Sequence, residues 1–181
     1  MVSVEAALAG IKPWPIEVDA LDRTWTIPAR PASEWFLAVL SGRGYPIVPE
    51  LLADGQEELF SEAMINGEIQ HAELERLNRE ALEVASGMPW YQAERLMVSV
   101  AAQWRTVGGL FGLHGVDLDT TSLGRVLSTT YVLAIQHLTK EERFSFDARL
   151  TAPPPGQRAS DYNPADYQEA FAELIRQSKV N

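Results

Sequence analysis

The clearest alternation of apolar and polar residues lies near the N-terminus. Ile16, Val18 and Ala20 alternate with two acidic residues, which is the spacing of a strand with one buried face. A second run of β-favouring residues, TWTI, spans 24–27, and the three residues 21–23 connect the two runs. We therefore expect a β-hairpin over about 16–27, although its turn lacks the Asn-Gly or Asp-Gly pair typical of hairpins.

From Pro31 onward the apolar residues recur at helical spacing. Trp35 and Val39, for example, belong to one apolar stripe of a helix that Gly42 ends. The sequence predicts, in chain order, helices over 2–9, from Pro31 or Ser33 to Gly42, through 51–52, over 56–65, 69–85, 89–107 and 122–138, and from 139 to about 150.

Several helix ends carry recognisable signals. Asn66-Gly67 closes the helix over 56–65, and Gly87 stops the next one. Gly108-Gly109 is expected to loosen or end the helix over 89–107. Thr139 and Glu142 have the spacing of a capping box, in which each side chain satisfies a free backbone donor of the other residue.

A proline-rich segment divides the chain. We expect a helical domain over 1–152, a linker over 153–163 and a C-terminal helix over 164–181. The apolar stripe of this last helix has two possible partners, since it either folds back on its own domain or binds a neighbouring subunit. The stripe consists of Tyr167, Phe171, Leu174 and Ile175.

Composition narrows the class of protein. Apolar residues make up 46% of the 181 residues, and the formal net charge is −10. An acidic chain does not suit duplex DNA or RNA, whose phosphates need clustered cations, but it suits a basic protein partner. The absence of cysteine excludes disulfides and thiolate chemistry. No run approaches the roughly 20 apolar residues of a membrane span, and the first ten residues do not resemble a signal peptide.

No catalytic constellation is visible. The three histidines, His71, His114 and His137, have no metal-ligand spacing, and His114, in a glycine-rich loop, is the most site-like. The glycines form no phosphate-binding loop and no GxSxG elbow is present. We therefore expect no enzyme activity, cofactor or metal. An enzyme with an unfamiliar site around His114, or an acid pair of the glycosidase type, remains the alternative.

Charge and aromatic residues suggest where a partner could bind. Eleven acidic residues but only two basic ones lie between 50 and 94, which indicates either a solvated helical surface or a docking face for a basic helical partner. Three tryptophans fall on predicted apolar stripes and are expected in the core: Trp25, Trp35 and Trp104. Trp90 and Tyr91, at a helix start, either join the core or serve as exposed interface anchors.

An ordered set of motifs carries a family resemblance. Residues 25–35 read W-x-IPARPA-x-x-W, and IVPELL follows at 47–52. An acidic helical middle, a tryptophan-containing helix and a GVDLD loop at 115–119 come next, and FDARLTAPPPG closes the set at 146–156. In this order the motifs resemble those of the tail assembly chaperones of long-tailed phages, of the siphovirus type, that infect actinobacteria.

The resemblance implies a non-enzymatic assembly factor in the host cytoplasm. Such proteins bind the tape measure protein, which is long, helical and aggregation-prone, and help tail tube subunits polymerise around it. They are often made in two lengths by a ribosomal frameshift. The family has no catalytic residues to carry over. The alternative is a structural virion component, such as a head–tail connector or completion protein, whose termini would lock into neighbouring subunits and which would stay in the virion.

Overall fold

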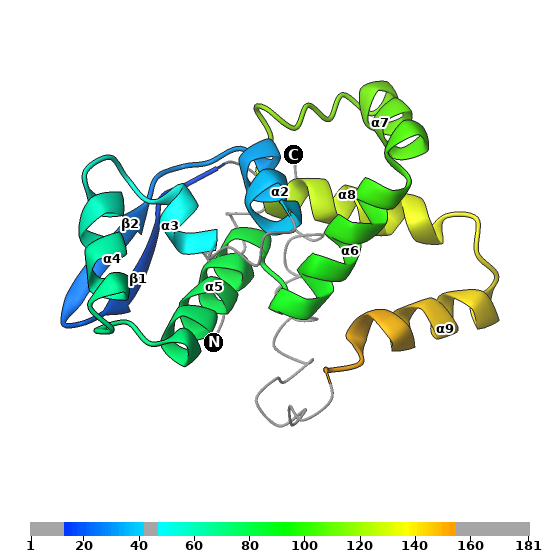
Figure 1. Cartoon of the computed structure of the whole chain (residues 1–181). Coiled ribbons are helices and arrows are strands. Elements are labelled where there is room, and N and C mark those ends of the chain that lie inside the picture. The colour runs from blue at the N-terminus through cyan, green and yellow to red at the C-terminus, as the bar shows by residue number, and fades with distance from the viewer. Residues whose placement is uncertain (1–12, 42–46, 155–181) are drawn as a thin grey trace, which may run out of the picture.

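The computed structural model describes residues 13–41 and 47–154. In these ranges a two-stranded antiparallel sheet precedes eight helices (Figure 1), which confirms the predicted class, mainly α with an N-terminal hairpin. The helix predicted over 2–9, most of the linker and the C-terminal helix lie outside the described residues. The elements are β1 (Ile16–Ala20), β2 (Arg23–Ile27), α2 (Ala32–Leu40), α3 (Ile47–Leu51), α4 (Gln56–Ile65), α5 (His71–Ser86), α6 (Trp90–Ala102), α7 (Trp104–Leu113), α8 (Leu123–Ile135) and α9 (Lys140–Thr151).

The predicted hairpin turns through Leu21 and Asp22. The strands pair in a register that sets Ile16 opposite Ile27. Both turn residues have positive φ, 56° and 55°, which is what the tight turn between two right-twisted strands requires. Because residues other than glycine adopt this conformation at a cost of roughly 1–2 kcal/mol, packing of the hairpin, rather than turn propensity, must hold it together.

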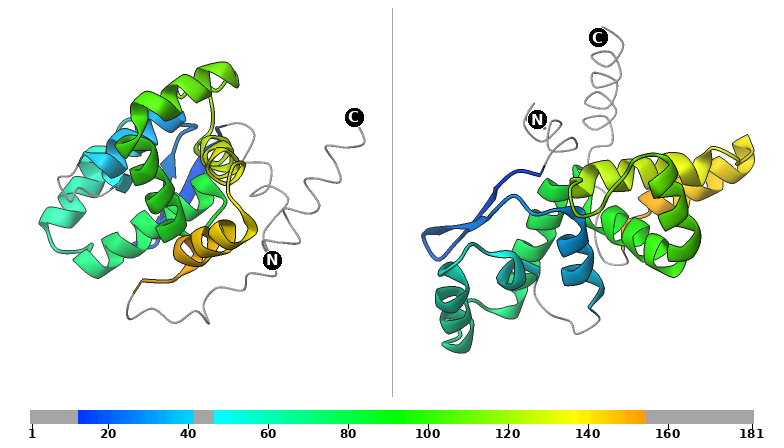
Figure 2. Two further views of the ribbon diagram at one scale, coloured as in Figure 1. Left: turned by 90° about the vertical axis from the view of Figure 1, so that its right-hand side faces the viewer. Right: turned by 90° about the horizontal axis from the view of Figure 1, so that it is seen from above.

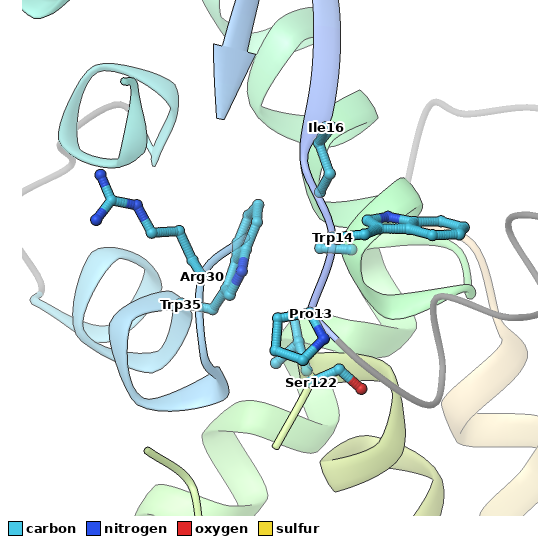
Figure 3. Close-up of a pocket in the computed structure, with 8 residues that line it drawn as sticks. Pro13, Trp14, Ile16, Arg30, Trp35 and Ser122 are labelled. Carbon is cyan, nitrogen blue, oxygen red and sulfur yellow. The ribbon is translucent and has the colours of Figure 1, made fainter. Parts of the chain in front are cut away.

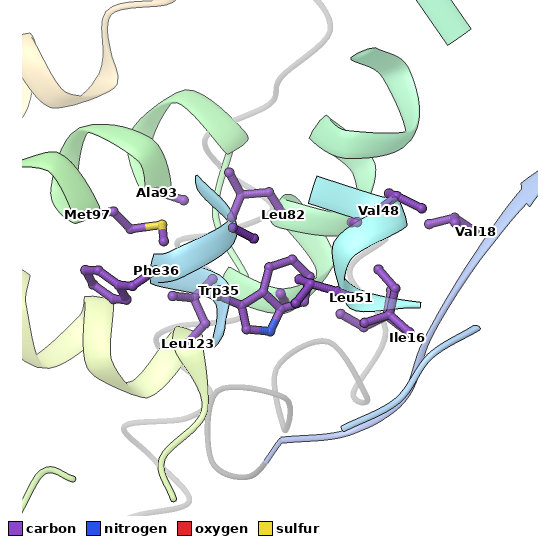
Figure 4. Packing of buried hydrophobic residues seen from close by; sticks show 14 of the residues in the cluster. Ile16, Val18, Trp35, Phe36, Val48, Leu51, Leu82, Ala93, Met97 and Leu123 are labelled. Carbon is purple, nitrogen blue, oxygen red and sulfur yellow. The ribbon is translucent and has the colours of Figure 1, made fainter. Parts of the chain in front are cut away.

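The core gathers around α5, which contacts β1, α3, α6 and α8. Trp35 and Phe36 of α2 point into the space between these elements (Figure 4). The apolar face of the hairpin closes one side of the core, where Ile16 and Val18 are buried. Each large side chain removed from water in this way contributes roughly 1.5–3 kcal/mol, so the core is the main source of stability.

A loop far along the sequence caps the beginning of α2. Pro31, the residue before this helix, makes no side-chain cap. Instead, the backbone N–H groups of Ala32 and Ser33 donate to the carbonyl oxygens of Thr121 and Leu118, at 2.9 and 3.0 Å. These bonds satisfy donors that every helix start leaves free, and they tie the loop before α8 to the N-terminal part of the chain.

The helix predicted over 89–107 is in fact two helices, α6 and α7. The backbone departs from helical geometry at Gln103, with φ −117° and ψ 25°. Gly108 and Gly109, predicted to loosen or end the helix, lie inside α7. The prediction that Trp104 belongs to the core is wrong, since this side chain is 49% exposed. The break turns α7 away from the direction of α6, so Trp104 does not continue the buried stripe of α6.

Several other helix boundaries agree with the predictions, whereas α8 ends at Ile135, three residues before the predicted 138. The bounds of α4 match the predicted 56–65, and Gly87 ends α5 with a positive φ of 69°. The predicted capping box begins α9: the N–H of Thr139 donates to Glu142 Oε2 at 2.9 Å, and the N–H of Glu142 donates to Thr139 Oγ1 at 3.3 Å. The end of α5 and the start of α9 are thus determined by residues close in sequence, as predicted.

The elements form an elongated arrangement. The hairpin and α4 lie at one end, and α7 and α9 lie toward the other, in Figure 1 and in the view from above in Figure 2. The two ends therefore offer separate surfaces, joined through α5 and α6.

None of the helices in the described part of the chain has both the length and the apolar character needed to cross a membrane.

Candidate partner-binding surface

A groove lies between the hairpin and α4. Its volume is about 260 Å³, and we call it the hairpin–α4 groove. Two of its lining residues are apolar and well exposed, Leu21 at 41% and Leu59 at 49%. The rest of its exposed lining is chiefly polar, so the two leucines are apolar positions within a polar groove. The lining residues are Leu21, Arg23, Trp25, Leu59, Glu62, Ala63, Asn66 and Glu68.

Packing beneath the groove holds its two walls in place. The rings of Trp25 from β2 and Phe60 from α4 meet edge to face, with centroids 4.9 Å apart, and both are buried. Trp25 Nε1 donates to the Ala20 carbonyl oxygen at 3.1 Å. The side chain of Gln56 accepts a hydrogen bond from the N–H of Thr26 at 2.8 Å. The groove is therefore a preformed feature of two elements that share a core.

The acidic middle of the chain has two kinds of surface. On α5, most carboxylates form ion pairs with arginines of the same helix. Arg76 forms ion pairs with Glu73 at 2.8 Å and with Glu80 at 2.6 Å, and Arg79 pairs with Glu75 at 3.1 Å. Arg76 holds the pKa of the Glu73 carboxyl below its ordinary value, chiefly through their hydrogen bond. Three of the four carboxylates of α5 are thus paired with its two arginines.

The acidic surface of α4 is not balanced in this way. Among the described residues, four carboxylates of α4 and the turn after it form no ion pair: Glu57, Glu58, Glu62 and Glu68. Arg23 is the one cation that lines the hairpin–α4 groove. Uncompensated charge of one sign favours a partner of the opposite sign and speeds the encounter with it.

Sequence reasoning did not find the groove, although it did single out the acidic middle. Leu59 falls between glutamate and phenylalanine in the run QEELFSE at 56–62, and nothing in that run distinguishes it from Phe60. In the structure Phe60 is fully buried while Leu59 is half exposed. The available signal was the weak separation of apolar and polar residues in α4, which leaves an apolar residue on an outer face.

Two of the predicted partner-binding residues, Trp90 and Tyr91, begin α6. Tyr91 is only 7% exposed, and its hydroxyl donates to the Thr151 carbonyl oxygen at 3.3 Å. Trp90 is half-buried, with the Arg79 guanidinium 4.8 Å from the ring centroid. Both side chains therefore have partners within the chain, and their binding to another protein stays a prediction.

The other four predicted partner-binding residues belong to the C-terminal helix. Tyr167, Phe171, Leu174 and Ile175 lie outside the described residues, so the two alternatives for this helix, folding back or binding a neighbour, remain as the sequence left them.

A single arginine holds the end of α9. Arg95 Nη1 donates to the carbonyl oxygens of Arg149, Leu150 and Ala152, at 2.8, 2.9 and 2.6 Å, and its guanidinium lies 5.3 Å from the centre of the Tyr91 ring. The carbonyl groups at a helix end lack partners within the helix, so a cation placed there is stabilising. This group of contacts, which we call the Arg95 clamp, joins α9 to α6.

A half-buried carboxyl occupies the junction of α5 and α6. Glu83 accepts a hydrogen bond from the N–H of Trp90 at 3.2 Å. Burial raises the pKa of the Glu83 carboxyl above its ordinary value, and the hydrogen bond opposes this rise only in part. The group acts as a cap on the start of α6, and the nearby charges of Glu80 and Arg79 shift its pKa in opposite directions.

The histidines are all exposed. His71 lies 3.3 Å from a carboxylate oxygen of Glu75, His114 follows the last residue of α7, and His137 lies in the α8–α9 connection beside Gln136. In the described ranges, no three histidine, aspartate or glutamate side chains gather where they could hold a metal ion.

A second hollow lies beside the first strand. Trp14, Arg30, Trp35 and Ser122 are among its lining residues (Figure 3). Its volume is about 10 Å³, enough for about one water molecule. It is a packing gap between the chain before β1 and α2, and it is too small for a ligand.

Comparison of the chain with protein-family models, with characterised proteins and with solved structures finds no match.

Proposed function

We propose that this protein is a non-enzymatic tail assembly chaperone of a long-tailed actinobacteriophage. In this role it binds the tape measure protein in the host cytoplasm and assists polymerisation of the tail tube around it. The observation that carries the proposal is the ordered set of motifs from Trp25 to Gly156, which resembles that family.

Several of these motifs lie where secondary-structure elements meet. Trp25 and Trp35 are both buried and bracket the passage from β2 into α2, while IVPEL forms α3. Leu118, in the GVDLD loop, caps α2, and Leu150 lies where the Arg95 clamp holds α9. A set of motifs that positions several elements relative to one another supports a shared fold better than any single motif could.

The surface suits a helical client. A chaperone for such a client needs exposed apolar side chains that can cover the client's own, on a protein that stays dispersed before binding. Leu21 and Leu59 supply apolar contacts at the hairpin–α4 groove, and the uncompensated carboxylates of α4 keep free copies apart through repulsion.

Co-expression with fragments of the tape measure protein encoded by the same phage tests the proposal. We expect this protein to raise the soluble yield of at least one fragment and to co-purify with it. Failure to change the solubility of any of a set of overlapping fragments would contradict a chaperone role.

Analysis of purified virions separates the proposal from the structural alternative. A chaperone is released before the tail is complete, so we expect the protein to be absent from virions. A fixed number of copies per virion would instead identify a connector or completion protein. A gene position between the tail tube and tape measure genes would add independent support.

A further inference from the structure

We infer that the hairpin–α4 groove is the docking site for an amphipathic helix that carries lysine or arginine beside its apolar residues. The inference deepens the proposed function, on which it rests for the identity of the partner as a segment of the tape measure protein. The physical character of the occupant follows from the groove itself.

One side of α4 borders the groove; Leu59, Glu62 and Asn66 are exposed there, and Ala63 is buried. Leu59, Glu62, Ala63 and Asn66 line the groove at positions i, i+3, i+4 and i+7, which form one side of a helix. Ile65 is 84% exposed and lies three residues after Glu62, on the adjoining part of the same side. The outer surface of α4 thus combines exposed apolar side chains with carboxylates.

The edge of the hairpin is less suited to an added strand. The N–H of Thr26 already donates to Gln56, and the carbonyl oxygen of Thr26 accepts from the N–H of Ala53 at 2.9 Å. An extended partner pairing along β2 would meet these occupied backbone groups. Recognition at this end of the molecule therefore goes through side chains that enter the groove, as with a helix lying in a shallow channel.

The charge of the groove selects a basic occupant. Glu62 and Glu68 line it beside one cation, Arg23, and in the described residues neither of these two carboxylates is in an ion pair. A helix with lysine or arginine one turn from a leucine can place its apolar side chain against Leu21 and Leu59 while its cation meets these carboxylates.

One alternative occupant of the groove and two alternative docking sites are less suitable. The chain's own segment 164–181 contains three acidic and two basic residues, so its charge does not complement an acidic groove. Elsewhere on the described surface, Leu113 of α7 and Phe144 of α9 are also well exposed, but Phe144 lies between Arg143 and the mixed charges of α9. The charges of α9 around Phe144 are of both signs, and α7, which carries Leu113, has no carboxylate to attract a basic helix.

A synthetic helical peptide of leucine and lysine is a suitable probe, and the same peptide with glutamate in place of lysine is its control. Binding to the full-length chain is measured by fluorescence anisotropy at about 50 and 300 mM salt. We expect the lysine peptide to bind, more weakly at the higher salt, and the glutamate peptide not to bind. Equal binding of both peptides would overturn the inference.

Matched variants locate the site. Leu59→Ala, and separately Glu62→Gln with Glu68→Gln, should each raise the Kd for the lysine peptide by about fivefold or more. The controls change the same residue types on other elements, Leu113→Ala and Glu94→Gln with Glu141→Gln, and should change Kd by less than about twofold. Similar effects of groove and control variants would show unspecific attraction to an acidic protein and overturn the inference.

The same variants distinguish this inference from the proposed function. If the wild-type chain solubilises a tape measure fragment and Leu59→Ala does so equally well, the chaperone role stands and the groove is not its docking site. If the lysine peptide binds in the groove but no tape measure fragment responds to the wild-type chain, the docking site stands and the chaperone role fails. Circular dichroism should show that each variant is folded, since all of these side chains are exposed.

Discussion

At the scale of single residues, position relative to solvent decides what each side chain does. Leu59 and Phe60 are neighbours in sequence, yet Phe60 seals the contact between α4 and the hairpin while Leu59 faces the groove. Arg76 and Arg79 pair with three carboxylates of their own helix. Glu83 differs from those carboxylates because it is half-buried at a helix junction, which gives it a distinct dependence on pH.

Replacement of Glu83 by glutamine should make stability less dependent on pH. Because burial raises its folded-state pKa, Glu83 contributes stability that is complete below its unfolded pKa, about 4.3, and is lost as the pH rises through the folded pKa. Glutamine is neutral throughout and can still accept from the Trp90 N–H. We therefore expect Glu83→Gln to raise the free energy of unfolding at pH 7 by up to about 1 kcal/mol.

Urea unfolding at pH 7 and pH 4 measures the effect of Glu83→Gln. The gain over the wild type should shrink at pH 4, where the wild-type carboxyl is itself largely protonated. The control is Glu94→Gln on the exposed side of α6, for which we expect little change at pH 7. A loss of stability at pH 7 in the Glu83 variant would mean that its charge on the start of α6 outweighs the cost of burial.

At the scale of elements, α7 shows how two adjacent glycines can differ. A methyl group on Gly109 would meet no atom within 4 Å, whereas one on Gly108 would lie 3.3 Å from two ring carbons of Trp104. Glycine within a helix costs roughly 0.5–1 kcal/mol relative to alanine. The ring of Trp104 therefore lies over the backbone of α7 at Gly108, where a side chain would collide with it.

The two alanine substitutions should therefore have different effects. Gly109→Ala should raise the free energy of unfolding by about 0.5–1 kcal/mol, and Gly108→Ala should give no gain because its methyl displaces the Trp104 ring. Thermal unfolding followed by circular dichroism at 222 nm compares them. Tryptophan fluorescence, to which Trp104 contributes together with four other tryptophans, is the second readout: a shift in Gly109→Ala but not in Gly108→Ala would contradict this packing.

Helix ends were the part of the element structure that the sequence predicted best. The Thr139–Glu142 capping box and the αL glycine Gly87 act through neighbours in sequence, so local reasoning identified them. The break at Gln103 has no glycine or proline signal, and it depends on how α6 and α7 pack. The hairpin–α4 groove was missed for a related reason, because it exists only where β2 and α4, distant in sequence, meet.

At the scale of the whole molecule, the Trp25–Phe60 contact determines whether the groove exists. Phe60→Ala should lower the free energy of unfolding by about 3–5 kcal/mol, because a fully buried ring is lost from the contact between hairpin and α4. Leu59→Ala, one residue away, should stay within about 0.5 kcal/mol of the wild type. Urea unfolding followed by tryptophan fluorescence and by circular dichroism measures both variants; equal losses would contradict the burial described.

The Arg95 clamp has a mechanical consequence. Most of α9 faces outward, and Leu150 is its one buried residue, but its last carbonyl groups are fastened to α6 by Arg95 and Tyr91. A tension applied to the chain beyond Pro154 would therefore pass directly into α6 and bypass the thin packing of α9. A tag or a bound partner attached after Pro154 would therefore pull on α6 through the Arg95 clamp.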